Sequence, residues 1–291
     1  MKNDVIETIN MSMNSFSKGQ KAIAEFILTN YDRAAFITAR GLGEEVGVSE
    51  STVVRFAVTL GFDGYPDLQG ELQELIRNKL TAVQRIKVSE TYFKSDNILN
   101  KVLDMDAECI KTTMRETSPQ EFEKAVEATS NAKNIYIIGG RSAAALSRFL
   151  HFYMNIIFEN VKLVHTTSSS EMFEQIMRLK KGDVLIGISF PRYSKMTIKA
   201  FEFAKDCGAD VIAITDSETS PIAKAATIKL LARSGMLSFI DSLAAPLSLI
   251  NAFLVAVSTR KNTDVISSLS KLENIWEEYD VYEKTKGKLT E

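Results

Sequence analysis

Residues 183–194 decide the fold, and they read DVLIGISFPRYS. A short run rich in Ile and Val predicts a buried strand over 183–189. Pro191 and the polar residues after it predict a turn, and Ser194 can cap the helical pattern that follows. A strand, a turn and a helix in this order make one unit of a parallel sheet covered by helices.

The same alternation of strands and helices runs through the second half of the chain. Further strands are predicted at 135–138, 162–165, 210–215 and 228–232. Five strands separated by helical patterns predict an α/β fold with a doubly wound, five-stranded parallel sheet. Two more helices are predicted after the sheet, over 241–260 and from 264 to about 284.

The N-terminal part of the chain is predicted to be all-α. One helix covers 17–30, a second follows Thr38 and stops at Gly47, and a third follows Ser49 and stops at Gly61. A glycine suits the joint at 47, because a left-handed backbone there would cost any other side chain energy. The positions that a helix-turn-helix unit needs to be apolar are filled by Leu42, Val46, Val48, Val53 and Phe56. The spacing predicts a DNA reader with its motif at about 39–58, followed by a polar helix over 67–88.

Polar side chains fall on the outer face at the start of the third helix, where such a unit meets base edges. They are Ser49, Glu50, Ser51, Thr52 and Arg55. Arg55 suits either a bidentate pair with guanine or a phosphate contact, and both roles stay open. The alternative is a three-helix domain that contacts only proteins, with Ser49 as a plain cap. The net charge of −2 argues against an extended basic surface. A helix-turn-helix domain needs only a small DNA-contacting surface, however, and a dimer presents this surface twice.

Hydroxyl-rich loops follow the first and third predicted strands. Ligands of open parallel sheets bind beyond the carboxyl ends of the strands, and a helix start there favours a phosphate. The candidate ligand-binding residues are Gly140, Ser142, Ser189, Arg192 and Ser194, with His165 as a further candidate at the end of the second strand. The alternative is that the serines are only caps and turn formers, and that His165 is structural.

Several classes of protein do not fit the sequence. It lacks a well-formed phosphate loop for nucleoside triphosphates and a dinucleotide fingerprint, so no cofactor is expected. Cys109 and Cys207 stand outside any metal-ligand spacing, so neither a metal site nor a disulfide framework is expected. Without a secretory signal or an apolar run of membrane-spanning length, the protein is expected in the cytoplasm.

The sequence resembles the RpiR family of bacterial transcription regulators, which join a helix-turn-helix domain to a SIS (sugar isomerase) domain. The resemblance of the reader lies in 47–56, 60–62 and 64–66, and that of the SIS strands in 186–189 and 213–217. It implies that the second domain binds a phosphosugar, and that binding alters operator recognition by a homodimer or homotetramer.

The sequence departs from the family pattern near the ends of the third and first predicted strands. The usual signature, Ser-x-Ser-Gly-x-Thr, keeps its ends at Ser189 and Ser194, while Pro191 and Arg192 replace the middle Ser-Gly. The first loop has Ile138 where the family has a glycine. Two alternatives follow, in which Arg192 adds a charge-assisted contact or phosphate binding is lost.

The expected organisation is a DNA-binding domain over 1–78, a helical connector over 79–125, a SIS domain over 126–265 and a C-terminal helix over 266–291. The expected function is that of a DNA-binding transcription regulator, without enzymatic activity, whose operator affinity is modulated by a phosphosugar. The alternative is a phosphosugar isomerase-type enzyme, for which Glu171 and His165 would be the candidate acid and base.

Overall fold

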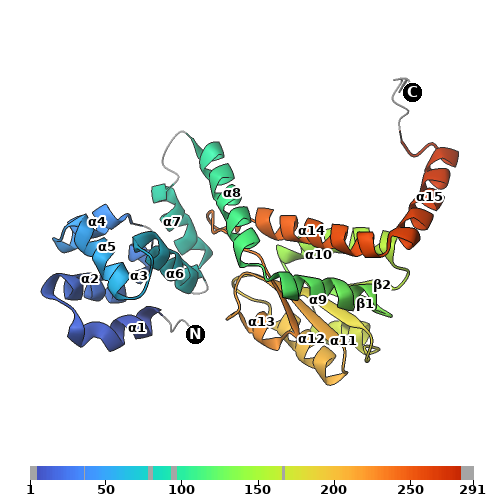
Figure 1. Ribbon diagram of the computed structural model, residues 1–291, viewed down its shortest axis with the longest axis horizontal. Coiled ribbons are helices and arrows are strands. Elements are labelled where there is room, and N and C mark those ends of the chain that lie inside the picture. Colours follow the sequence, from blue (N-terminus) through green and yellow to red (C-terminus); the bar gives the residue numbers. More distant parts are fainter. Residues whose placement is uncertain (1–4, 36, 78–80, 93–96, 166–167, 283–291) are drawn as a thin grey trace. The chain divides into compact units, whose positions relative to one another are not determined.

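The computed structural model describes residues 5–35, 37–77, 81–92, 97–165 and 168–282. The chain divides into two compact units (Figure 1). The first unit comprises Met1–Leu103 together with Met236–Asp241, and the second comprises Asp104–Gly235 and Ser242–Glu291. Within the described residues, no helix combines the length and the apolar character needed to cross a membrane.

The first unit consists of short helices, and its apolar core is formed by side chains from residues 5–75 together with Met236. The helices are α1 (Val5–Ser12), the 3₁₀ turn η1 (Met13–Ser15), α2 (Lys18–Thr29), α3 (Tyr31–Ala34), α4 (Ala39–Val46), α5 (Glu50–Thr59), α6 (Tyr65–Arg77) and α7 (Ala82–Tyr92). The rings of Phe16 and Phe56 lie 5.1 Å apart at the centre of the core, and Ile23, Leu42 and Val53 are fully buried beside them. The predicted all-α fold of this region is confirmed, and α1, η1 and α3 are additions to the predicted helices.

The predicted single helix over 67–88 is wrong, because two helices, α6 and α7, cover this region. The start of α7 has its own local signal. The Oγ1 of Thr81 accepts the N–H of Gln84 at 3.3 Å, and the side-chain oxygen of Gln84 accepts the N–H of Thr81 at 2.9 Å. This reciprocal capping box begins a new helix, and apolar periodicity alone does not reveal it.

Tyr65 ties α6 to the segment between α3 and α4. Its hydroxyl lies 3.0 Å from the carbonyl oxygens of both Ala34 and Ile37, and the residue is 2% exposed. Burial disfavours the phenolate and raises the pKa of Tyr65 to about 12.

The raised pKa of Tyr65 predicts a loss of stability at alkaline pH. The neutral phenol is favoured in the folded state, so its contribution is complete below the unfolded pKa near 10 and is lost as the pH rises through about 12. We expect this loss to reach roughly 2–3 kcal/mol, since one pKa unit corresponds to about 1.4 kcal/mol. Urea unfolding of the wild type and of Tyr65→Phe between pH 8 and 12 measures it. Equal pH slopes for the two proteins would contradict the prediction.

The second unit is built on the predicted five-stranded parallel sheet, which is confirmed. Its strands are β1 (Ile135–Gly139), β2 (Val161–Val164), β3 (Val184–Ile188), β4 (Asp210–Thr215) and β5 (Ile228–Leu231). Their order in the sheet is β2-β1-β3-β4-β5, and every neighbouring pair is parallel. In the register, Ile137 of β1 faces Leu163 of β2 on one side and Ile186 of β3 on the other. This order puts the loops after β1 and β3 side by side.

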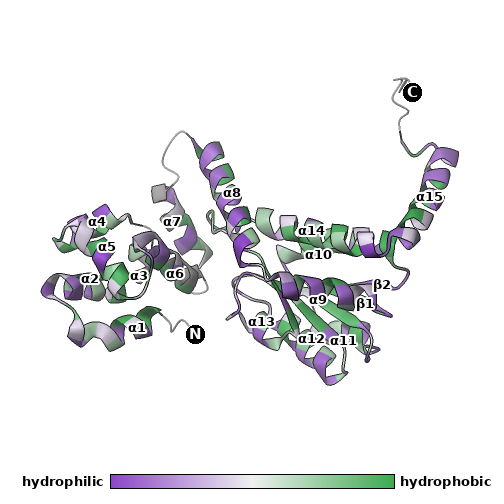
Figure 2. Ribbon diagram, in the orientation of Figure 1, coloured by the Kyte–Doolittle hydropathy of each residue, from purple (hydrophilic) through white to green (hydrophobic). Residues whose placement is uncertain are grey.

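Helices cover both faces of the sheet, as a doubly wound fold requires. They are α9 (Pro119–Ser130), α10 (Ala143–Ile157), α11 (Ser169–Ile176), α12 (Lys195–Asp206), α13 (Pro221–Ala225) and α14 (Ala244–Arg260), with α8 (Ile98–Glu116) before them and α15 (Asn262–Glu278) after them. Ile137 and Ile186 face α10 and α14, whereas Tyr136 and Leu185 belong to the other apolar cluster, with α11 and α12. The central strand β3 is therefore buried on both faces and carries no charged residue, and Figure 2 shows the middle of the sheet mainly in green.

A hairpin over 236–241 lies between β5 and α14 in the sequence, yet it belongs to the first unit. Met236 and Asp241 form an antiparallel bridge, and Met236 packs against the core of the first unit. Arg85 of α7 is 1% exposed, and its Nη1 lies 3.0 and 3.2 Å from the two carboxylate oxygens of Asp241. The hydroxyls of Ser89 and Ser238 add a hydrogen bond of 2.8 Å.

The hairpin corrects the predicted start of the helix over 241–260. This helix, α14, begins at Ala244, because Asp241 is held in the hairpin by Arg85 and by its bridge to Met236. The last predicted helix, 264–284, is α15 over Asn262–Glu278, and residues 283–284 lie outside the described residues.

Candidate functional site

The turn between α4 and α5 has the conformation that the sequence predicts. Gly47 adopts φ +74°, in the left-handed region, and its N–H donates to the carbonyl of Gly43. Ser49 caps α5, because its Oγ accepts the N–H of Thr52 at 3.3 Å. Thr38 caps α4 in the same way through the N–H of Gly41, at 3.1 Å. These caps fix where both helices of the motif begin.

Gly43 lets the two helices approach each other closely, and it was not among the predicted motif positions. A Cβ at this position would lie 2.7 Å from the carbonyl oxygen of Val48, which is backbone and cannot move aside like a flexible side chain. The available signal was a glycine four residues before the turn glycine Gly47.

Gly43→Ala is expected to destabilise the first unit by about 1–3 kcal/mol, the usual cost of overpacking. Denaturant unfolding of the full chain measures it. Gly70→Ala in α6 is the matched control, because a Cβ there meets no atom within 4 Å and alanine favours the helix. If both substitutions changed stability equally, the close approach at Gly43 would not be the cause.

The five predicted DNA-binding side chains lie together at the start of α5. Ser49, Glu50, Ser51 and Arg55 are exposed and Thr52 is half-buried. The Oγ of Ser49 lies 2.9 Å from that of Ser51 and 2.8 Å from Oγ1 of Thr52. The Nε of Arg55 donates to the carbonyl of Ser51 at 3.2 Å. Because Val53, Phe56 and Ala57 are buried on the opposite side, this polar face of α5 points to solvent.

The loops after β1 and β3 approach each other at the carboxyl edge of the sheet. A Cβ on Gly140 would lie 3.6 Å from the Oγ of Ser194. Ser189 is 4% exposed, and its Oγ accepts the N–H of Ser194 at 3.1 Å. The Oγ of Ser194 in turn accepts the N–H of Thr197 at the start of α12, at 3.3 Å. The structure thus brings Gly140, Ser189 and Ser194 together.

Each of the two loops carries an arginine in the left-handed region. Arg141 has φ +56° and Arg192 has φ +60°, and both side chains are exposed. Left-handed backbone is uncommon for residues other than glycine and is concentrated at ligand sites. Arg192 was a candidate from the sequence and Arg141 was not, although it stands between the candidates Gly140 and Ser142.

Ser142 is exposed at the start of α10, and its side chain makes no capping hydrogen bond. The N–H groups of Ala143, Ala144 and Ala145 donate to the carbonyls three residues earlier, at 3.1–3.2 Å. The first turn of α10 therefore uses these donors internally, without the hydroxyl of Ser142.

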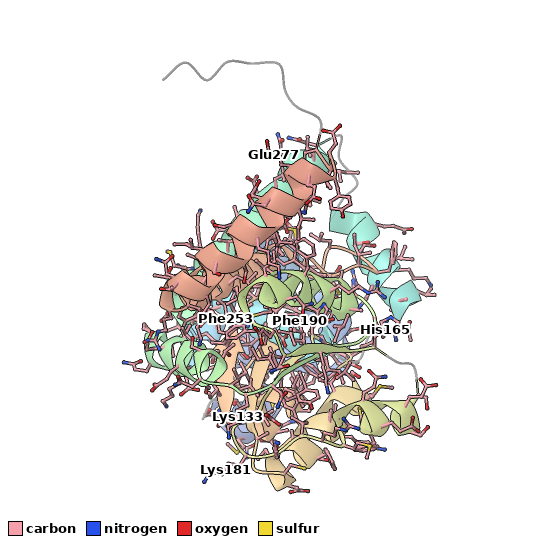
Figure 3. The ribbon with its side chains drawn as sticks, turned by 90° about the vertical axis from the view of Figure 1, so that its right-hand side faces the viewer. Lys133, His165, Lys181, Phe190, Phe253 and Glu277 are labelled. Carbon is pink, nitrogen blue, oxygen red and sulfur yellow. The ribbon has the colours of Figure 1, made fainter. Side chains whose placement is uncertain are left out.

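His165 follows β2, on the other side of β1 from Ser189. Figure 3 labels His165 and Phe190 near the carboxyl ends of the strands, and Lys133 and Lys181 near the amino ends. The Nη2 of Arg148 lies 2.8 Å from the Nε2 of His165. A guanidinium has only donors, so Nε2 accepts this hydrogen bond. The backbone N–H of His165 donates to the side-chain oxygen of Gln175 at 3.1 Å.

A buried carboxylate at the end of β4 supports the loop after β3. Asp216 is 1% exposed, and its Oδ1 accepts the hydroxyl of Tyr193 at 2.9 Å. The Oγ1 of Thr215 lies 3.2 Å from the same oxygen and 3.1 Å from the Oγ of Ser220. Neither Tyr193 nor Asp216 was among the candidates predicted from the sequence. The signal was an acidic residue placed directly after an apolar strand.

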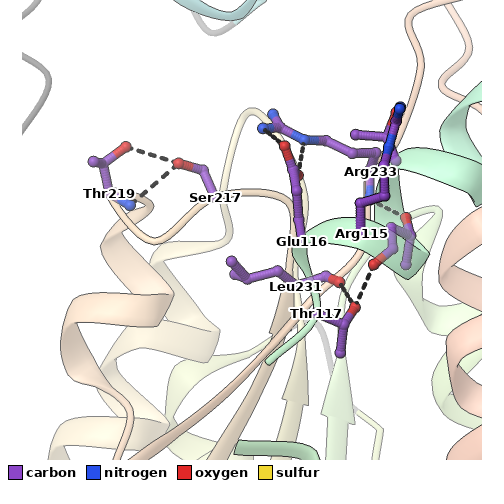
Figure 4. Close-up of polar contacts among 9 residues, drawn as sticks. Arg115, Glu116, Thr117, Ser217, Thr219, Leu231 and Arg233 are labelled. Carbon is purple, nitrogen blue, oxygen red and sulfur yellow. Dashed lines mark hydrogen bonds and ion pairs between the residues drawn. The ribbon is translucent and has the colours of Figure 1, made fainter. Parts of the chain in front are cut away.

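The chain after β5 is fastened to α8 (Figure 4). The hydroxyl of Thr117 donates to the carbonyl of Leu231 at 2.9 Å. The guanidinium of Arg233 pairs with both carboxylate oxygens of Glu116, at 2.5 and 2.8 Å. The backbone N–H of Arg233 donates to the Oγ1 of Thr113 at 2.8 Å. These bonds fix the end of the sheet from which the 236–241 hairpin departs.

In the described part of the chain, His, Cys, Asp and Glu form no group of three or more suited to a metal ion.

Two family models match the chain. The helix-turn-helix domain of the rpiR family matches residues 3–79, and the SIS domain matches residues 129–256. The first covers the α4–α5 turn and the second covers the loops after all five strands.

Relatives and solved structures are similar to this chain over different lengths. An uncharacterised HTH-type transcriptional regulator of Caldanaerobacter subterraneus is 27% identical over 279 residues, which cover 94% of this chain and 96% of that protein. The sugar isomerase domain of an RpiR transcription factor from Sphaerobacter thermophilus is 26% identical, with a TM-score of 0.57, and covers 60% of this chain and 97% of that one. NanR of Vibrio vulnificus, solved with ManNAc-6P, has a TM-score of 0.57 at 19% identity and covers 93% of this chain and 98% of that one.

Proposed function

Because this chain belongs to the RpiR family, in which a helix-turn-helix domain is joined to a SIS domain, we propose that it is a DNA-binding transcription regulator whose operator affinity is modulated by a phosphorylated sugar. The observation that carries the proposal is the pairing, in one chain, of the exposed polar face of α5 with the converging serine loops of the second unit.

The DNA contacts are assigned to the polar face of α5. Ser49, Ser51 and Thr52 bring hydroxyls to phosphates or base edges, and Glu50 is placed to accept from cytosine. Arg55 is the candidate for a guanine or a phosphate. The reader is proposed to act within residues 1–78, with a connector over 79–125, the SIS domain over 126–265 and a C-terminal helix over 266–291.

The phosphate is assigned to the junction of the loops after β1 and β3. The hydroxyl of Ser189 accepts the N–H of Ser194, so its own proton remains to be donated to an anion. Ser142 and Ser194 add hydroxyls, Gly140 lets the ligand approach the backbone, and Arg192 adds a positive charge. His165, beyond β2, is placed to meet the sugar. The ManNAc-6P bound to the similarly folded NanR supports phosphorylated sugars as the class.

A regulator is proposed in preference to an isomerase. The acid–base alternative needs His165 as a proton carrier, but the Nε2 of His165 already accepts from Arg148. A relative that aligns over 94% of this chain carries the name of an HTH-type transcriptional regulator. We further propose a homodimer or homotetramer in the cytoplasm. The net charge of −2 does not favour an extended DNA-binding surface on one chain, but two helix-turn-helix domains can contact the two half-sites of one two-fold symmetric operator.

The test is a binding measurement on the full chain at one fixed salt concentration. A duplex selected from a random pool should contain two related half-sites. Adding the bound member of a panel of sugar phosphates should change duplex affinity by about 5–150-fold, and the duplex should change sugar-phosphate affinity by the same factor. A sugar phosphate that binds without changing duplex affinity would overturn the regulatory part. Turnover of that sugar phosphate would favour the isomerase.

A further inference from the structure

The polar face of α5 contains two apolar side chains. Val54 is 38% exposed and Val58 is 55% exposed. The apolar residues that anchor α5 to the core are others, namely Val53, Phe56 and Ala57. The two valines are therefore an apolar part of a surface whose other members are hydroxyls, a carboxylate and a guanidinium.

Their spacing aligns them with the proposed DNA contacts. Val54 and Val58 follow Ser51 by three and seven residues, so the three share one face of the helix. Arg55 lies beside them, with its Nε bonded to the carbonyl of Ser51. Valine has one strongly preferred side-chain rotamer in a helix, so its methyl groups are already positioned before any partner arrives.

We propose that Val54 and Val58 read the C5-methyl groups of thymines in the operator, which makes them specificity-determining residues. The inference rests on the proposed function, since it places the polar face of α5 in the major groove. Among the four bases, only thymine presents a methyl group there. Val54, one turn from the start of the helix, takes the thymine nearer the helix start, because the first residues of a recognition helix lie deepest.

DNA fits this surface better than a protein partner does. The core of a protein interface is depleted in charged residues, whereas exposed Glu50 and Arg55 lie on the same side of α5 as the valines. Isolated methyl contacts among hydrogen-bonding groups match the edges of bases in the major groove.

The experiment replaces each thymine of the selected duplex, one at a time, with uracil, which keeps the base pair and lacks the methyl. Full-length wild type, Val54→Ala and Val58→Ala are titrated with every duplex. We expect one thymine in each half-site at which uracil weakens the wild type about fourfold, the value of one buried methyl group. The same uracil substitution should not further weaken the duplex affinity of Val54→Ala. For Val58→Ala, we expect the same loss of the uracil effect at a second thymine.

A matched control is Met11→Ala, which truncates another exposed apolar side chain of the first unit, 70% exposed in α1, and should keep the full uracil penalty. Sequence-specific binding with no uracil penalty, or a penalty that persists in both valine variants, would overturn the inference and leave the proposed function standing. A change of oligomeric state in the valine variants, with DNA affinity unchanged, would overturn it in favour of a second copy. Absence of specific DNA binding would overturn the proposed function as well.

Discussion

Asp241→Ala is expected to lower the free energy of unfolding of the first unit by about 3–5 kcal/mol, the cost of breaking a buried ion pair from one side. The guanidinium of Arg85 is buried in α7, and Asp241 supplies both of its carboxylate oxygens to one Nη1. Alanine leaves the positive charge buried without this counter-charge. Hydrogen exchange resolved on the amides of α7, together with denaturant unfolding of the full chain, measures the loss.

Two variants separate the charge effect from the loss of a side chain. Glu44→Ala breaks an ion pair between Arg40 and Glu44, whose side chains are 78% and 67% exposed, respectively. Because the pair is exposed, its loss should change stability little. The double variant Arg85→Met with Asp241→Leu removes both buried charges and should recover much of the loss. An Asp241→Ala protein no less stable than Glu44→Ala would contradict the prediction.

Ser189→Asp should weaken sugar-phosphate binding on the order of a thousandfold. A carboxylate about 4 Å from a phosphate opposes it by about 4 kcal/mol at the effective dielectric constant of a protein surface, and about 1.4 kcal/mol corresponds to tenfold. Ser189→Ala removes one donor and should cost only about 0.5–1.5 kcal/mol. Calorimetry with the sugar phosphate that binds the wild type measures both.

Thr259→Asp is the matched control for this prediction, because it adds the same charge at an exposed position of α14. It should leave the affinity unchanged, and the melting temperature of Ser189→Asp should show that the second unit still folds. Wild-type affinity in a folded Ser189→Asp protein would place the anion elsewhere than between the loops after β1 and β3.

The sheet was predictable because its strands are short apolar runs with polar ends. Each predicted strand agrees with β1 to β5 to within one residue at either end, since a run such as Val184–Ile188 has no polar face to expose. The caps at Thr38 and Ser49 were predictable for a related reason. The hydroxyl and the N–H that it accepts are only three residues apart, so the sequence itself places them in contact.

Other features depend on contacts that local sequence does not specify. The hairpin over 236–241 rests on a pair of residues 156 positions apart, Arg85 and Asp241, and the helical pattern after it extended over Asp241 in the prediction. The same limit applies to Asp216, which supports Tyr193 from a neighbouring strand. At the candidate ligand site, the serines were found from their places after strands, whereas the left-handed backbone of Arg141 and Arg192 is visible only in the fold.

The hairpin also bears on how this protein can be divided. A gene fragment that ends near residue 103 encodes the helices of the first unit and omits Asp241, so it carries Arg85 without its carboxylate. Cloning such a fragment to study DNA binding alone would yield a weakened module. Recombination that exchanged the first domain as one continuous stretch of gene would likewise separate Arg85 from its own Asp241. The two parts of the gene are therefore expected to be inherited together.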